Sequence, residues 1–301
     1  MKNILLIRND RFGEFLLIIP AIRALKESYP QARITLAVSS QVKELAGLIE
    51  YVDEVFVWDE VKKDLRRHKF DLCVILNPTK EAHMASFLAG IPSRLGYNRK
   101  WGFLLTHKIA DTKGLGLKHE VESNLELVSV IGAKTKDQSI SLGKLPAFSN
   151  SKYEGAVAVH PYTSDSVKDW SADKFRALIS KLAKELGCKL IIIGKQEYDY
   201  QHDDFYDVSA GIINLVNKTT LVELAQILKL CRLLITCDSG PMHLAEAVGT
   251  PLIAIFRNDL PGKCPRRWAP RSRESIVIEG KNLADISVES VFDKAKEVLK
   301  T

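Results

Sequence analysis

The chain has 301 residues, of which 46% are hydrophobic and 27% are charged. These values are ordinary for a globular protein large enough for two domains, and they exclude a disordered or fibrous chain. The net charge of +6 is mild. It reflects either solvated surface or a face that attracts phosphorylated ligands or an anionic membrane. The densest basic run, residues 62–69, lacks interleaved aromatic side chains, so it indicates an exposed helix face and no nucleic-acid site.

Cysteine usage and hydropathy predict a cytoplasmic protein. The chain has an odd number of cysteines and no CxxC pair: Cys73, Cys188, Cys231, Cys237 and Cys264. This pattern is typical of reduced thiols and does not suit a zinc site. The apolar run at the N-terminus is too short for a secretion signal. No apolar stretch approaches the roughly 18 residues of a transmembrane helix.

The first half of the chain alternates short apolar runs with helical patterns. We expect a helix at residues 81–88 and buried strands at residues 3–7, 33–38, 54–57 and 72–76. Apolar residues also recur at helical spacing from Phe15 to Leu25, before a stop at Tyr29-Pro30. Pro20 lies inside this predicted helix and should remove a hydrogen bond or bend the helix.

The alternation stops at residues 145–155, where Pro, Ser, Asn and Gly cluster, and then restarts. Further strands are expected at residues 156–160, 189–193, 233–236, 252–256 and 275–278, and helices at 172–186, 221–230 and 287–299. The sequence therefore predicts an α/β protein with two Rossmann-like domains, residues 1–150 and 151–301, that face a central cleft. The last helix is free to pack back on the first domain.

The strongest local signal is the run Asp-Ser-Gly-Pro-Met-His at residues 238–243, between a predicted strand and a predicted helix. Pro241 suits the first helical turn, while Ser239 and Gly240 leave the backbone accessible. Free N–H groups and the positive end of a helix dipole at this position predict a site for a diphosphate. A plain turn capped by Ser239, with His243 as a structural histidine, explains the same pattern.

Three weaker polar groups also follow predicted strands. Residues 8–14 contain two arginines and two acids, which provide either a general base in a cleft or surface charge at a helix start. Thr163, Ser164 and Lys168 could hold a phosphate. Glu197, shortly after Gly194, could accept hydrogen bonds from ribose hydroxyls. The sequence has no GxGxxG, Walker A, GxSxG or HExxH motif, which disfavours dehydrogenases, P-loop enzymes, hydrolases of the elbow type and zinc proteases.

Taken in order, these segments resemble the lipopolysaccharide heptosyltransferases, glycosyltransferase family 9. The resemblance rests on RNDRFGE with a following PAIRALK, then HP with K-x-W, then G-x-x-E, then DSGPMHLAEAVGTP, and spans nearly the whole chain. It implies a GT-B fold with an acceptor domain followed by a donor domain. It also implies inverting transfer of heptose from ADP-heptose to a Kdo- or heptose-bearing lipid A core.

The resemblance also implies roles for individual residues. Glu14 stands where the family usually has the Asp that acts as base, and Asp10 is a possible substitute; the extra methylene of Glu changes the position of the carboxylate. Lys168 and Asp238 complete the catalytic set. Donor contacts are expected at Thr163, Ser164, Lys168, Glu197, Asp238, Ser239, Gly240, Met242 and His243. Acceptor contacts are expected at Arg11 and, because basic residues gather in the least regular stretch of the first domain, at Arg94, Arg99 and Lys100, with Lys113 and Lys118; a solvated basic loop explains the residues of this stretch as well.

No metal and no cofactor besides the donor are expected, and no nucleic acid. The resemblance suggests a monomer in the cytoplasm, in peripheral contact with the inner face of the bacterial inner membrane. Where the family usually continues Gly-Pro-Thr after Phe256, this chain has Arg257-Asn258-Asp259. Two alternatives stay open: a GT-B enzyme that uses another nucleotide sugar, and a donor-binding homologue whose catalysis is impaired by the change at Glu14.

Overall fold

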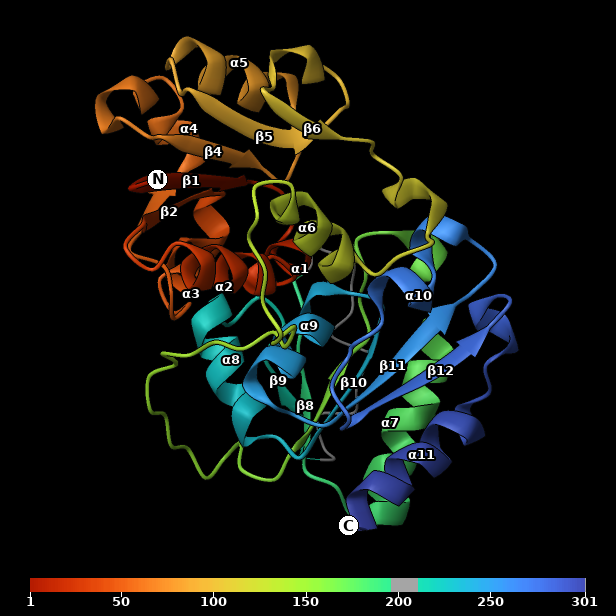
Figure 1. The fold of residues 1–301 in the computed structure, drawn as a ribbon. Helices are drawn as coiled ribbons and strands as arrows, with labels where there is room; N and C mark the ends of the chain where they lie inside the picture. Colours follow the sequence, from red (N-terminus) through yellow and green to blue (C-terminus); the bar gives the residue numbers. More distant parts are fainter. Residues whose placement is uncertain (196–210, 301) are drawn as a thin grey trace. The chain divides into compact units, whose positions relative to one another are not determined.

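The computed structural model describes residues 1–195 and 211–300. The chain divides into two compact units, Met1–Lys144 and Leu145–Thr301. Each unit is an α/β structure built on one parallel sheet, with helices packed on its faces (Figure 1). The division falls at the start of segment 145–155, where the sequence pattern is interrupted.

The sheet of the first unit has the strand order β3-β2-β1-β4-β5-β6, and all of its pairs are parallel. Its strands are β1 Asn3–Arg8, β2 Arg33–Val38, β3 Glu54–Val57, β4 Leu72–Ile75, β5 Ser93–Tyr97 and β6 His107–Ile109. Its helices are α1 Phe12–Leu16, α2 Ile19–Ser28, α3 Lys43–Ala46, α4 Trp58–Val61, α5 Lys80–Leu88 and α6 Glu120–Ser129.

The second unit repeats this plan with the order β12-β11-β10-β7-β8-β9. Its strands are β7 Val157–His160, β8 Leu190–Ile192, β9 Ile213–Asn214, β10 Leu233–Cys237, β11 Leu252–Arg257 and β12 Ser275–Gly280. Its helices are α7 Ala172–Leu186, α8 Leu221–Leu230, α9 Gly240–Val248, α10 Pro265–Trp268 and α11 Val288–Lys300. Thr220 and Glu223 form a capping box at the start of α8.

The central strands are buried on both faces, which explains their continuous apolar sequences. In the second unit the core lies between the sheet and the pair α7 and α11, where the rings of Trp170 and Phe175 meet edge to face at 4.9 Å. The structure therefore places the last helix against α7 of its own unit. All five cysteines are free, and Cys73, Cys231 and Cys237 are buried.

Two sequence predictions about helices were wrong. The pattern from Phe15 to Leu25 is divided between α1 and α2, and Pro20 lies in the first turn of α2, where a missing N–H removes no helical hydrogen bond. The basic run at residues 62–69 forms a turn and the 3-10 helix Leu65–His68 in place of an α-helix. No helix in the described part of the chain is long and apolar enough to cross a bilayer.

Candidate functional site

Some of the predicted site residues follow strands that flank the switch points of the two sheets, where the strand order reverses. In the first unit this point lies between β1 and β4, and in the second between β7 and β10. Ligands of open parallel sheets bind beyond the carboxyl ends of the strands at such points. Asn77, just after β4, donates from Nδ2 to Oδ1 of Asn9, just after β1, over 3.1 Å. The predicted segments at residues 8–14 and 238–243 follow strands at these points, whereas Arg94, Arg99 and Lys100 lie on or after β5.

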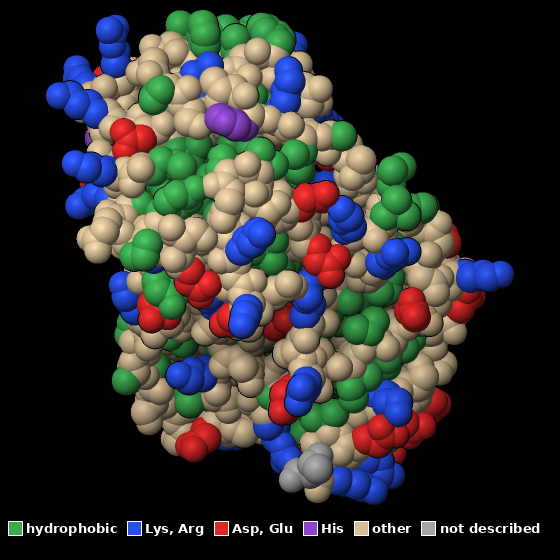
Figure 2. All heavy atoms as spheres, viewed as in Figure 1, with side chains coloured by type: hydrophobic (Ala, Val, Ile, Leu, Met, Phe, Trp, Pro, Cys, Tyr) green, Lys and Arg blue, Asp and Glu red, His purple; other side chains and the backbone are tan. Residues whose placement is uncertain are grey.

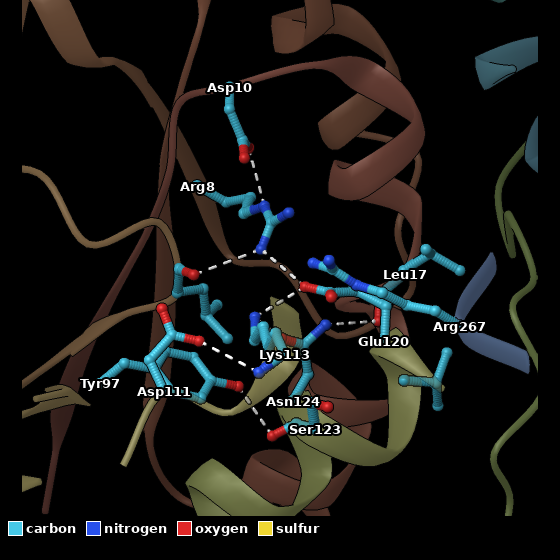
Figure 3. A network of polar contacts seen from close by, with 12 residues as sticks. Arg8, Asp10, Leu17, Tyr97, Asp111, Lys113, Glu120, Ser123, Asn124 and Arg267 are labelled. Carbon is cyan, nitrogen blue, oxygen red and sulfur yellow. Dashed lines mark hydrogen bonds and ion pairs between the residues drawn. The ribbon is translucent and has the colours of Figure 1, made fainter. Parts of the chain in front are cut away.

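A buried network of charges surrounds the end of β1 (Figure 3). The Arg8 guanidinium lies 2.7 Å from Asp10 and 3.6 Å from Glu120, and it donates from Nη1 to the Leu76 carbonyl over 3.3 Å. Glu120 also pairs with the Lys113 ammonium at 2.6 Å. The side chains of Arg8 and Glu120 are 4% and 1% exposed. Removing one charged partner from such a buried group leaves the remaining charges unpaired, and this commonly lowers the free energy of unfolding by about 3–5 kcal/mol.

Glu14 lies in the first turn of α1, beside this network. Burial raises the pKa of its carboxyl, against the opposing effect of the Arg8 charge, while Asp10 raises it further. A carboxylate with a raised pKa is a better proton acceptor near neutral pH than an ordinary one. Asp10 differs because its carboxylate is held by Arg8. Burial therefore distinguishes the Glu14 carboxyl, whose pKa is raised, from the Asp10 carboxylate, which pairs with Arg8.

The predicted acceptor residues of the first unit differ in their surroundings. Arg11 is exposed at the start of α1. Arg94 donates from Nε to the Leu104 carbonyl over 2.8 Å and also bonds the Ile91 carbonyl, so it braces a turn of its own unit. Arg99, whose side chain is largely exposed, pairs with Asp111 at 3.3 Å, and Lys100 is exposed in a left-handed conformation.

At the switch point of the second unit, buried polar side chains join β7 to β10. His160 Nδ1 lies 3.0 Å from Thr236 Oγ1 and 3.2 Å from Ser239 Oγ, and the two hydroxyls are 2.9 Å apart. Burial lowers the pKa of His160 to about 3, so the ring is neutral at physiological pH. This triangle fixes the turn that leads into α9.

The start of α9 has the properties of an anion site. Ser239 is the N-cap residue, but its side chain makes no capping hydrogen bond, because its hydroxyl is engaged by His160 and Thr236. The N–H groups of Ser239 and Gly240 thus lack a side-chain cap at the positive end of the helix dipole, whereas Pro241 has no N–H and the Met242 N–H donates to the Ser239 carbonyl over 3.2 Å. Ser239 therefore occupies the N-cap position, as a plain turn would also require, but its side chain does not cap the helix. The side chains of Met242 and His243 are buried, so this turn offers a ligand mainly backbone groups.

Lys168 and Asp238 form an ion pair at the same edge of the sheet. The Lys168 ammonium lies 2.6 Å from Asp238 Oδ2, with side-chain exposures of 15% and 8%. Lys168 ends the 3-10 helix Ser166–Lys168, which follows β7. Thr163 donates to the Asp165 carbonyl over 2.8 Å and to the Asp169 carboxylate, whereas Ser164 is exposed. Glu197 lies outside the described residues.

Sequence reasoning missed several side chains that support the Lys168 segment. Arg257 donates from Nη1 to the Val167 carbonyl over 2.9 Å and pairs with Asp259 at 2.7 Å. The Trp268 ring lies 6.0 Å from the Lys168 ammonium. The signal for Arg257 was its departure from the family's Gly-Pro-Thr, whereas the short helix α10 that carries Trp268 has no periodic pattern.

In the first unit, reasoning from the sequence assigned no role to Glu120, because the chain has no HExxH motif and no other pattern includes this residue. The residue instead anchors the pair formed by Arg8 and Lys113. Lys113 was expected in a basic loop that contacts the acceptor, but its side chain is only 11% exposed. Within residues 1–195 and 211–300, no group of three His, Cys, Asp or Glu side chains is arranged to hold a metal ion.

Residues 58–296 match the family model of glycosyltransferase family 9 (heptosyltransferase). Lipopolysaccharide heptosyltransferase 3 of Escherichia coli K12 is 26% identical, over 81% of this chain and 79% of its own. Lipopolysaccharide heptosyltransferase 2 of the same strain is 22% identical, over 92% of this chain and 87% of its own.

Solved structures share the fold. The E. coli ADP-heptose lipopolysaccharide heptosyltransferase II matches with a TM-score of 0.84 at 21% identity, over 99% of this chain and 98% of its own. An E. coli heptosyltransferase solved with ADP matches with a TM-score of 0.77 at 15% identity, over 98% and 99%. The α/β fold with two Rossmann-like sheets of GT-B type is confirmed.

Proposed function

The chain belongs to glycosyltransferase family 9, the heptosyltransferases, and on this premise we propose that it transfers heptose from ADP-heptose to the lipopolysaccharide inner core. Relatives that align over most of the chain are lipopolysaccharide heptosyltransferases. The observation that carries the proposal is the pairing of Lys168 with Asp238 beside the uncapped start of α9. A lysine ammonium beside backbone N–H groups that lack a side-chain cap, at a switch point, suits the diphosphate of a nucleotide sugar.

The proposed reaction is an inverting displacement. Glu14 takes the proton of the acceptor hydroxyl as its oxygen attacks the anomeric carbon, on the face opposite the diphosphate. The bond to the diphosphate breaks, and ADP leaves with its electron pair. Lys168 and the N–H groups of Ser239 and Gly240 stabilise the negative charge that develops on the leaving oxygen. Asp238 holds Lys168 in place before the donor arrives.

We propose that this chemistry proceeds without a metal ion. A divalent cation in other transferases neutralises the departing diphosphate, and Lys168 with the α9 dipole provides positive charge for that purpose here. Transfer should therefore be unchanged by EDTA. The acceptor is anchored by its lipid A, so we also propose that the protein makes peripheral contact with the inner membrane from the cytoplasm. We propose that it works there as a monomer.

Donor binding tests this proposal directly. Isothermal titration calorimetry should detect ADP-heptose and ADP, and Lys168→Ala should weaken both by about 10- to 100-fold, which corresponds to about 1.5–3 kcal/mol for a charge-assisted contact. Lys184→Ala, which removes an exposed lysine of α7, is the matched control and should bind normally. Stronger binding of a UDP- or GDP-sugar would favour another GT-B activity. An unchanged Kd for Lys168→Ala would remove this residue from the site.

A further inference from the structure

Large apolar side chains are exposed side by side at one edge of the first unit. Phe87 and Leu88, at the end of α5, are 47% and 66% exposed, and Phe103 in the 3-10 helix η3 (Gly102–Leu104) is 70% exposed. Isolated exposed apolar residues are common, but a contiguous group indicates a contact surface. Figure 2 shows hydrophobic side chains gathered at the edge of the molecule that carries α5 in Figure 1, with Lys and Arg side chains beside them.

Contacts between side chains make this a single surface, which we call the α5–η3 face. The Arg94 guanidinium lies 5.5 Å from the centre of the Phe87 ring while it bonds the Leu104 carbonyl of η3. The Lys80 ammonium, at the start of α5, lies 5.9 Å from the Trp101 ring, whose centroid is 6.3 Å from that of Phe103. The face comprises Lys80, Phe87, Leu88, Arg94, Trp101 and Phe103.

The charge of this surface is one-sided. Residues 82–110 contain Arg94, Arg99, Lys100 and Lys108 and no Asp or Glu, and of the acids that flank this range Glu81 pairs with Lys62 and Asp111 pairs with Arg99. Within the described residues, no ion pair joins Lys80 or Lys100 to an acid. Exposed apolar side chains next to Lys side chains without an acidic partner are complementary to a lipid layer with a negatively charged surface and an apolar interior.

We propose that the α5–η3 face docks on a bilayer that contains anionic phospholipids. Leu88, Phe87 and Phe103 enter the boundary between headgroups and acyl chains. Lys80 of the face and Lys100, which precedes Trp101 in the sequence, contact the phosphates. Trp101, between the two sets, has the amphipathic character of residues at that depth. The inference rests on the proposed function, because an acceptor anchored by lipid A lies in such a layer, and it assigns the surface by which the enzyme reaches it.

Vesicle flotation of the full chain tests this proposal. Wild-type protein should bind phosphatidylcholine vesicles that contain phosphatidylglycerol and bind pure phosphatidylcholine weakly, and high salt should reduce the difference. Leu88→Ser with Phe103→Ser should weaken binding at least about 10-fold, because two apolar side chains lose their contact with the acyl region. Lys80→Ala should weaken it about fivefold. Leu88→Trp should strengthen it.

Val130→Ser is the matched control, since Val130 is 42% exposed at the end of α6 and outside the face. Thermal unfolding of each variant should match the wild type. The proposal is overturned if wild-type protein ignores anionic vesicles, if Val130→Ser weakens binding as much as the double variant, or if the double variant abolishes only self-association in sedimentation experiments.

A soluble acceptor separates this inference from the proposed function. The double variant should transfer heptose to a delipidated core oligosaccharide at the wild-type rate and lose transfer only to acceptor in vesicles. Vesicle binding without transfer to any acceptor would refute the proposed function but would still support the α5–η3 face as the docking surface. Equal transfer to the vesicle-bound acceptor by the double variant and the wild type would refute the docking face alone.

Discussion

Burial determines the chemistry of Glu14. The carboxyl is largely removed from water, and this raises its pKa despite the nearby Arg8 guanidinium. Because the folded-state pKa exceeds the unfolded one, the stabilising effect of the protonated group is present at low pH and is lost as pH rises through the folded pKa. At neutral pH the ionised form therefore costs stability and supplies basicity, a trade-off expected of a catalytic group.

Glu14→Gln tests both consequences. Turnover should fall by about 100-fold or more, the usual contribution of a positioned base, while ADP affinity stays near the wild-type value. At pH 7 the melting temperature of the variant should equal or exceed that of the wild type, and any advantage should disappear in acid. The activity of the wild type should decline on the acid side at a higher pH than an ordinary Glu carboxyl would give.

Asp10→Asn is the control for this variant, because its carboxylate is held by Arg8 at 2.7 Å. It should affect turnover less than Glu14→Gln does. Loss of transfer in Asp10→Asn with normal turnover in Glu14→Gln would reverse the two roles. Normal turnover in both variants would show that this segment is only an ion network at a helix start.

Strands with a continuous run of apolar residues could be predicted from the sequence. Strands that form only because they pair with an adjacent strand could not. The strands β2 and β3 begin and end at the predicted residues, because both segments are mainly apolar and rich in residues that favour strands. The strands β5 and β6 were missed, because β5 begins with Ser93 and Arg94 and β6 has only three residues, mostly exposed. These strands form because β5 pairs with β4 and β6 pairs with β5, and this pairing cannot be predicted from the local sequence.

The same division applies to the site. The segments at residues 8–14 and 238–243 could be located because each polar run directly follows an apolar strand. The contacts of Arg8 with Glu120, of Lys168 with Asp238 and of His160 with Ser239 could not, because they join residues far apart in the sequence that only strand order brings together.

Pro20 distinguishes the observed break between α1 and α2 from a continuous helix. At the first turn of α2 the ring fits the helical backbone and restricts the unfolded chain. Pro20→Ala should therefore destabilise the protein slightly, by about 0.4–1 kcal/mol. In a continuous helix the same change would stabilise it by up to about 3 kcal/mol. Urea unfolding distinguishes these outcomes by the sign of the change in midpoint.

At the scale of the whole molecule, one architecture occurs twice with different chemistry at its switch points. The first sheet presents carboxylates and a buried arginine after β1, and the second presents a lysine and an uncapped helix start after β7 and β10. Under the proposed function, the first unit supplies the base for the nucleophile and the second holds the leaving group.

The central claim is that the full chain is an active heptosyltransferase. Purified protein incubated with ADP-heptose and lipopolysaccharide core acceptors, with EDTA present, should yield product heavier by one heptose residue in mass spectrometry, with release of ADP. The same acceptors with other nucleotide sugars should yield little product. Tight ADP binding without any added heptose, or transfer of a different sugar, would contradict the claim.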